Sequence, residues 1–235
     1  MITDFSGSDL TEADFSGADL RYGRFQGSSL LRATLSGSRA KLADFSKANL
    51  SSARLISADL SRVTLNQASL VGADVTDSNL AGANLTAARL HQLQATGANF
   101  AGANLSGAEG REANFSNANL ADAVLLGADL SGSQLQNSNL TGANLEGANL
   151  QGSNLSAAVL RGANLEGANL EGAVFVELAV ASDSFIESVP QPAPGGTLAQ
   201  VDFSKALNLD QEQITYICSQ KGIHPACSRN SSGAP

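Results

Sequence analysis

The sequence predicts an all-β fold, a four-sided β-helix closed at its C-terminal end by a small helical cap. Three observations predict it. A large apolar residue recurs at every fifth position from Phe5 to Phe175, a small residue stands two positions before it, and the 235 residues include no Trp and only two Tyr. So few bulky residues cannot close an ordinary core, whereas regularly spaced apolar ones are typical of a repeat.

The period of five defines the coil. Of the 35 central positions, 32 are Leu, Phe or Val, and 33 of the positions two residues earlier are Ala, Ser, Gly or Thr. A helix needs apolar residues about every 3.6 positions and a strand about every 2, so neither accounts for the pattern. A chain that turns a corner at each repeat does, because four repeats then form a square coil of 20 residues with alternating large and small side chains along a narrow axis.

A 20-residue coil predicts that residues n and n+20 stack on the same face. Four arginines directly before a central position are followed 20 residues later by acids, and opposite charges on neighbouring rungs stabilise each other. Asn residues recur in the same way, as expected for an amide ladder. The predicted columns include Arg24–Asp44, Arg39–Asp59, Arg54–Asp74, Arg89–Glu109, Asn79–Asn99–Asn119–Asn139 and Phe5–Phe25–Phe45.

The pattern is interrupted in one region. Leu93 and Ala95 reverse the usual order of small and large residues, and Gly110 leaves a central position empty. Since core volume is normally conserved, we expect Phe100 and Phe115 to fill the missing space.

Residues 162–173, GANLEGANLEGA, show the motif at its cleanest. Tandem A(D/N)LXX motifs of this kind, which run from residue 3 to 175, resemble the pentapeptide repeat family, including its cyanobacterial members. The resemblance implies a right-handed quadrilateral β-helix, and handedness is not given by the period alone.

The repeats decay after Phe175, and we expect two parts, a β-helix over residues 1–185 and a linker with a C-terminal cap over 186–235. A last partial coil could include Leu178, Val180 and Phe185. Residues 189–197 (VPQPAPGGT) favour a linker. Residues 201–203 briefly restore the repeat. Asp210 is a suitable N-cap for a helix from about 211 to 221, with Gly222 as its C-terminal stop. Such a cap protects an open sheet end from strand addition.

Both cysteines lie in this tail. Cys218 and Cys227 are nine residues apart, and either a disulfide or two free thiols fits that spacing. The disulfide arrangement is similar to the C-terminal helical elements of cyanobacterial and chloroplast lumenal family members, and a disulfide implies an oxidising compartment. As given, the sequence lacks a signal peptide and indicates the cytoplasm, whereas removal of a leader would make the thylakoid lumen or periplasm possible.

The N-terminal end has no such cap in the pattern. The first coil, with its central residues Phe5, Leu10, Phe15 and Leu20, presents an open edge. We therefore expect either a homodimer through this solenoid end or cover from a segment outside this sequence.

Nothing in the sequence indicates catalysis, a cofactor or a metal site. His91 and His224 are the only histidines, and the repeat accounts for the acidic residues before the central positions. The net charge of −8 disfavours binding to nucleic acid, and no apolar run approaches the ~18 residues of a membrane helix.

Basic residues gather near the N-terminus, where residues 21–62 hold eight Lys or Arg and two acids. An ordinary solvated surface and a docking site for an acidic partner both fit this charge pattern. The candidate docking patch is Arg21, Arg32, Lys41, Lys47 and Arg62.

We therefore expect a non-catalytic structural or protein-interaction solenoid with an unknown protein partner. The alternative that the family resemblance implies is a DNA-mimicking inhibitor or protector of DNA gyrase. The acidic columns are short for a mimic, and the longest are Glu109–Asp129 and Glu146–Glu166.

Overall fold

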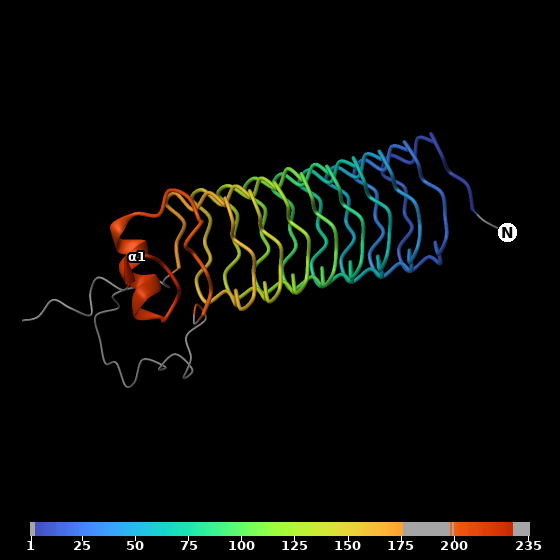
Figure 1. Ribbon diagram of the computed structural model, residues 1–235. Coiled ribbons are helices and arrows are strands. Elements are labelled where there is room, and N and C mark those ends of the chain that lie inside the picture. The colour runs from blue at the N-terminus through green and yellow to red at the C-terminus, as the bar shows by residue number, and fades with distance from the viewer. Residues whose placement is uncertain (1–2, 176–197, 199, 228–235) are drawn as a thin grey trace, which may run out of the picture.

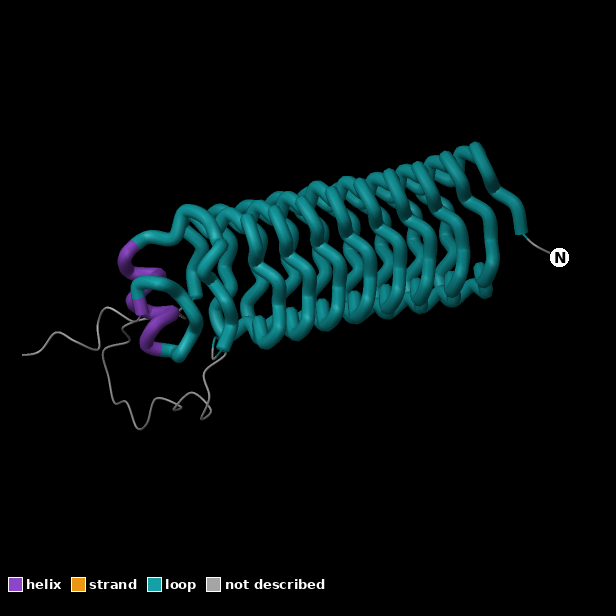
Figure 2. Tube along the Cα trace, in the orientation of Figure 1, coloured by secondary structure: helices purple, strands orange, loops and turns teal. Residues whose placement is uncertain are grey.

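The protein is a long four-sided shaft with a helical element across its C-terminal end (Figure 1). The computed structural model describes residues 3–175, 198 and 200–227. Residue n forms a parallel β-bridge with residue n+20, from Asp4–Arg24 to Asn154–Val174, which confirms the predicted coil. Each side contributes one bridging residue per coil, so the described part of the chain contains bridges and no continuous strand, and the shaft is drawn as loop in Figure 2.

Backbone hydrogen bonds explain the period. The N–H of the central residue Phe25 donates to the Asp44 carbonyl in the next coil at 2.7 Å, and the N–H of Asp44 donates back to the Gly23 carbonyl at 2.9 Å. A turn follows each central residue, closed by the Ser28 N–H on the Phe25 carbonyl at 3.1 Å. The second turn residue, here Gly27, has a positive φ of 63°, which is why glycine is frequent there.

Polar side chains before the central position hold each turn. The Asn99 Oδ1 atom accepts from the N–H of Ala101 at 3.1 Å, and most Asp and Asn residues at this position repeat the contact. This local bond explains the preference for Asn and Asp. The same amides also form the predicted ladder, because Nδ2 of Asn99 donates to Asn79 Oδ1 at 3.2 Å, and Asn119 and Asn139 continue it at 3.1 Å each.

The core confirms the predicted phenylalanine column. Phe25 stacks on Phe45 with 4.5 Å between ring centroids and on Phe5 with 5.2 Å. Glycine is required beside this column, since a Cβ atom on Gly23 would lie 2.8 Å from the Phe25 ring and 2.9 Å from the Leu20 carbonyl oxygen.

The irregular region is filled by two different means. Leu93 and Ala95 are both buried, and the rings of Phe100 and Phe115 meet edge to face at 5.5 Å, as expected from the sequence. The space at Gly110 is taken by another residue, because the Leu130 Cδ2 atom lies 2.9 Å from the point where a Cβ would stand.

The charged columns are confirmed as backbone pairs, and in the predicted columns Asp4–Arg24–Asp44 and Asp19–Arg39–Asp59 the ion pairs form on one side only. All four Arg–acid pairs are β-bridges. Within the described residues, however, Arg24 and Arg39 come within 4.0 Å of the acids of the preceding coil, Asp4 at 3.8 Å and Asp19 at 3.3 Å, rather than of the following one. These exposed side chains lean toward the N-terminal end of the shaft.

The described C-terminal segment contains helix α1, Gln211–Ser219, which ends two residues earlier than expected. Asp210 is its N-cap and forms a capping box with Gln213. At the other end Lys221, with φ of 62°, takes the left-handed conformation expected of Gly222. Gly222 serves a steric role, because its Cβ would lie 2.6 Å from Ile217 Cγ2.

The segment around α1 closes the shaft. Leu207 bridges Asn169 of the last coil, and Ile223 in turn bridges Asp202, so residues 201–208 form a rung in which the predicted repeat-like stretch 201–203 takes part. Phe203 and Ile217 are fully buried, and the Phe203 ring meets Phe175 at 5.9 Å.

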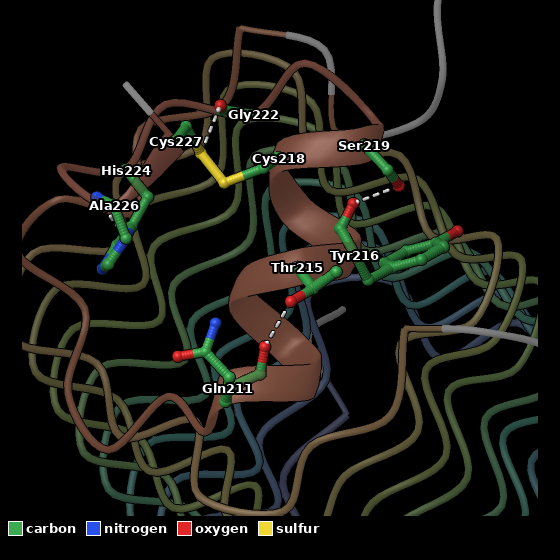
Figure 3. The surroundings of a disulfide bond; sticks show 9 residues. All are labelled: Gln211, Thr215, Tyr216, Cys218, Ser219, Gly222, His224, Ala226 and Cys227. Atoms are coloured by element: carbon green, nitrogen blue, oxygen red, sulfur yellow. Dashed lines mark hydrogen bonds between the residues drawn. A yellow bond between two sulfur atoms is a disulfide. The ribbon is translucent and has the colours of Figure 1, made fainter. Parts of the chain in front are cut away.

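A disulfide joins Cys218 of α1 to Cys227, beyond Gly222 (Figure 3). The bonded alternative is therefore the one the structure holds. The expected boundary at residue 185, the linker 189–197 and the core candidates Leu178, Val180 and Phe185 lie outside the described residues.

Candidate interaction surfaces

The predicted docking patch is divided among the corners of the shaft. Arg21 and Lys41 occupy the first turn position of the same corner in successive coils, where the Tyr22 N–H donates to the Lys41 carbonyl at 3.2 Å. Arg62 occupies the second turn position of that corner one coil further on. Arg32 and Lys47 lie at two other corners. The structure thus brings three of the five residues together and separates the other two.

Two exposed apolar side chains that were not predicted from the sequence lie between these cations. The Tyr22 side chain is 60% exposed and that of Leu42 is 40% exposed. They occupy the same turn position in adjacent coils, and Arg62 occupies this position in the coil after that of Leu42. We call Arg21, Tyr22, Lys41, Leu42 and Arg62 the corner stripe. Large apolar residues 20 apart at a turn position where glycine holds half of the places are the signal that would have revealed them.

The backbone at this corner is unfavourable for large side chains. Tyr22 and Leu42 each have φ of 60°, and Arg62 has φ of 55°. Left-handed backbone costs a residue with a Cβ roughly 1 kcal/mol more than it costs glycine. Further along the same column Gly82 and Gly102 hold this position. The backbone alone therefore does not favour the side chains of Tyr22 and Leu42.

The cations of the predicted patch differ in their partners. Arg21 forms a bidentate contact with Asp19, with distances of 2.8 Å from Nε and 2.6 Å from NH2, and these hydrogen bonds lower the pKa of Asp19 to about 2. Arg32 pairs with Glu12 at 2.7 Å. Lys41, Lys47 and Arg62 have no carboxylate within 4.0 Å in the described ranges. In the corner stripe, Lys41 and Arg62 are thus available to a partner.

The two longest acidic columns carry counter-charges. Asp129 is in contact with Arg111 at 2.5 Å, and Glu109 lies 3.2 Å from Nε2 of His91. Glu166 pairs with Lys205 of the capping segment at 2.8 Å. Burial opposes ionisation of Asp129, but hydrogen bonds from Arg111 and Ser131 outweigh it and lower the pKa of this carboxyl group.

No group of His, Cys, Asp or Glu among residues 3–175 and 200–227 has an arrangement that could hold a metal ion. His91 lies on the surface of the shaft, as expected, in contact with Glu109. Within the same ranges, no helix has the length and apolar character needed to cross a bilayer.

Comparison with known proteins agrees with this architecture. The family described as pentapeptide repeats matches in eight copies, over residues 3–37, 28–67, 68–107, 111–147 and 138–175. No curated protein sequence gave a match.

Several solved structures are similar. HetL, a pentapeptide repeat protein involved in heterocyst differentiation regulation from the cyanobacterium Nostoc sp. strain PCC 7120, is 32% identical over 74% of this chain and 85% of its own, with a TM-score of 0.37. QnrB1, a plasmid-mediated fluoroquinolone resistance protein, is 19% identical over 95% of this chain and 97% of its own, with a TM-score of 0.51. A pentapeptide repeat protein from the Arabidopsis thaliana thylakoid lumen is 28% identical over 55% of this chain and 81% of its own, with a TM-score of 0.37.

The likeness to QnrB1 concerns the fold alone. The matched repeats cover nearly the whole shaft, and pentapeptide repeat proteins fold as right-handed quadrilateral β-helices, in agreement with the four-sided coil described above. With the five-residue register, the stacked coils and the family match all in agreement, the chain belongs to the pentapeptide repeat family.

Proposed function

We propose that this protein is a non-catalytic interaction solenoid that binds an acidic surface of another protein through the corner stripe. The observation that carries the proposal is the meeting of Lys41 and Arg62, which have no carboxylate partner in the described residues, with exposed Tyr22 and Leu42. Tyrosine and arginine are among the side chains that contribute most at protein interfaces.

The stripe has the form expected of a small binding site. Tyr22 and Leu42 supply apolar area near the N-terminal end of the shaft, and the cations border it. A partner with an apolar contact flanked by carboxylates would bury the tyrosine ring and pair with Lys41 and Arg62. Such charges chiefly set the association rate and the choice of partner, so binding weakens as salt is raised.

A charge-reversal experiment tests the proposal. Poly-L-glutamate serves as the acidic probe, and its binding to the full chain is measured by fluorescence anisotropy at low salt. The K41E/R62E variant removes the two available cations of the stripe, while R32E/K47E makes the same change of charge at two other corners. We expect K41E/R62E to weaken binding substantially more than the control, and equal losses would overturn the assignment to this corner.

A second experiment tests the apolar side chain Tyr22 by cross-linking to a partner protein. A photoreactive phenylalanine analogue at Tyr22 is compared with the same analogue at Asn117, which also has a positive φ, of 59°, but lies at another corner. A protein cross-linked at Tyr22 alone, whose binding is lost in K41E/R62E, supports the proposal. Equal cross-linking from both positions contradicts it.

The runner-up function is a DNA-mimicking inhibitor or protector of DNA gyrase. Its electrostatic requirement is a continuous negative surface, whereas columns such as Asp4–Arg24–Asp44 alternate in sign and Glu166 is paired with Lys205. These contacts support the first proposal over this one. A gyrase supercoiling assay distinguishes them, since inhibition or drug protection at low micromolar protein would reverse the order.

We also propose that the protein works in an oxidising compartment such as a thylakoid lumen or a periplasm. The Cys218–Cys227 disulfide supports this, because disulfides persist where thiols are not kept reduced. Thiol alkylation of the protein in its native cell, before lysis, tests it. Two alkylated cysteines would place the protein in the cytoplasm.

A further inference from the structure

The first coil has an open edge in the described structure. In interior coils, the residue before each central position donates its N–H to the coil before and accepts from that coil at its carbonyl, as Asp44 does with residues 23 and 25. In the first coil four aspartates stand at this position, and none of their N–H or carbonyl groups has a backbone partner among the described residues. They are Asp4, Asp9, Asp14 and Asp19.

The apolar axis is also open at this end. Phe5, Leu10 and Phe15 are only partly buried, while the corresponding residues from Leu20 onward are buried. At the opposite end, residues 201–208 pair with the last coil at Asn169, and α1 lies across that end (Figure 1). A bare edge with free backbone groups and accessible apolar side chains is a template for an added strand.

The negative charge of the N-terminal end favours some added strands over others. Residues 3–20 contain five carboxylates and no cation. The sequence has nine acids in the 35 positions before a central residue, and four of the nine stand in the first coil. Hydrogen bonds from the turn residues lower the pKa of Asp9 and of Asp14, so both stay ionised at neutral pH.

A second copy of this chain does not satisfy that surface. Two N-terminal ends in contact would bring two rings of four aspartates together, and like charges facing each other across a sheet are destabilising. The C-terminal end of a second copy is covered by its own α1 segment. The homodimer, one of the two alternatives expected from the sequence, therefore becomes the competing outcome of the test.

The second coil shows which side chains can pair with the aspartates of the first coil. Arg24 and Arg39 lie next to Asp4 and Asp19 and approach them at 3.8 and 3.3 Å. Asp9 and Asp14 instead lie next to Ser29 and Thr34, and they have no cation within 4.0 Å in the described residues. At the N-terminal end of the shaft, the largest uncompensated charge is thus on Asp9 and Asp14.

We propose that the N-terminal end binds an extended segment of another protein by β-augmentation, with Lys or Arg side chains in register with Asp9 and Asp14. The segment lies parallel to the first coil, donates to and accepts from the four free aspartate backbones, and places apolar residues over Phe5, Leu10 and Phe15. This site is independent of the corner stripe and does not rest on the proposed function.

The probe is a synthetic 20-residue peptide that copies residues 21–40, with Ser29→Arg and Thr34→Arg in the peptide. Its control carries Ser29→Glu and Thr34→Glu. Binding to the full chain is followed by NMR, and amide exchange is read at Asp4, Asp9, Asp14 and Asp19. We expect these four amides, which lack acceptors, to exchange at least about tenfold more slowly with the basic peptide only.

A protein variant provides the matched control. D9N/D14N removes both charges and keeps an acceptor for the turn, as Asn does elsewhere in the shaft. We expect it to weaken binding of the basic peptide about tenfold. Several results would overturn the proposal: no binding at millimolar peptide, binding without protection of the four amides, or equal binding of both peptides. Protection that rises with protein concentration in the absence of peptide would assign the edge to a second copy.

Discussion

The Gln213 side chain donates a hydrogen bond to the Leu170 carbonyl oxygen at 2.8 Å and thereby joins α1 to the last coil of the shaft. The same Nε2 atom donates to the Ala173 carbonyl at 2.8 Å, while Oε1 accepts from the N–H of Asp210 at 2.7 Å. Gln213 is buried, so one side chain satisfies two carbonyls at the end of the shaft and one backbone donor at the start of the helix.

Replacing Gln213 by Leu should loosen the capping segment. The change leaves the buried Ala173 carbonyl and the Asp210 N–H without a partner among the described residues, which costs roughly 1–3 kcal/mol, while the Leu170 carbonyl keeps the N–H of Ala173 at 3.0 Å. Amide exchange of residues 201–223 should quicken, while exchange in coils before residue 150 stays unchanged. The control is Q211L on the exposed side of α1, and equal effects of the two variants would contradict this role for Gln213.

Removing the Tyr22 side chain should change the stability of the shaft little. Tyr22→Gly relieves the strain of a positive φ and loses little buried area, but it also adds conformational freedom to the unfolded chain. We therefore expect the free energy of unfolding to change by no more than about 1 kcal/mol, in either direction. Binding of the acidic partner should fall in the same variant. Urea unfolding measures the first quantity. A loss of several kcal/mol would mean that Tyr22 is structural and not a binding residue.

The Asp19 carboxyl group should make stability dependent on pH in the acid range. Its pKa in the folded protein is about 2, below the value of about 3.9 in an unfolded chain, because Arg21 and Arg39 contact it. The folded state therefore binds a proton at the Asp19 carboxylate less readily than the unfolded chain does. The stabilisation is present above about pH 4 and is lost as the pH falls toward 2.

The check is a series of urea unfolding curves for the native sequence and for D19N between pH 7 and pH 2. The midpoint difference between the two should be largest near neutral pH and vanish at the acid end. The D19N/R21Q double variant should add little to D19N alone, since the two residues act as one pair. A difference that is constant with pH would show that Asp19 acts through its turn rather than its charge.

Reduction of the Cys218–Cys227 disulfide should destabilise the capping segment and spare the shaft. Closing a loop of this length stabilises by about 2–3 kcal/mol in the chain-entropy description. We expect C218S/C227S to increase protease cleavage between residues 200 and 227 and to leave the circular dichroism of the coils unchanged. Loss of the whole β-helix signal on reduction would instead mean that shaft and cap unfold together.

The sequence predicted the coil because its rule is steric and strictly local. A large residue at each fifth position with a small one two before favours a coil of four repeats, and residues such as Phe25 and Phe45 stack as expected. Columns of Asn were predicted for the same reason, since residue spacing alone decides which amides meet. The N-cap at Asp210 followed from its own side chain and that of Gln213.

Other features depend on side-chain conformation, which the period does not determine. Arg24 and Arg39 had acids both before and after them in the same column, and only their rotamers decide that they turn toward the preceding coil. The same holds for Leu130, which fills the space beside Gly110. The predicted docking patch combines residues of different corners and leaves out exposed Tyr22 and Leu42, because the charge along the chain does not show which residues share a corner.

The stacking of residue n on residue n+20 also determines how such a protein can change in length. Inserting or deleting 20 residues preserves every column and moves the corner stripe relative to the cap by one step of about 4.8 Å along the axis. A change of five residues keeps the motif intact but turns everything on the N-terminal side by a quarter of a revolution. The distance and the facing of two bound partners can therefore be altered separately, in fixed increments, by changes that leave the core as it is.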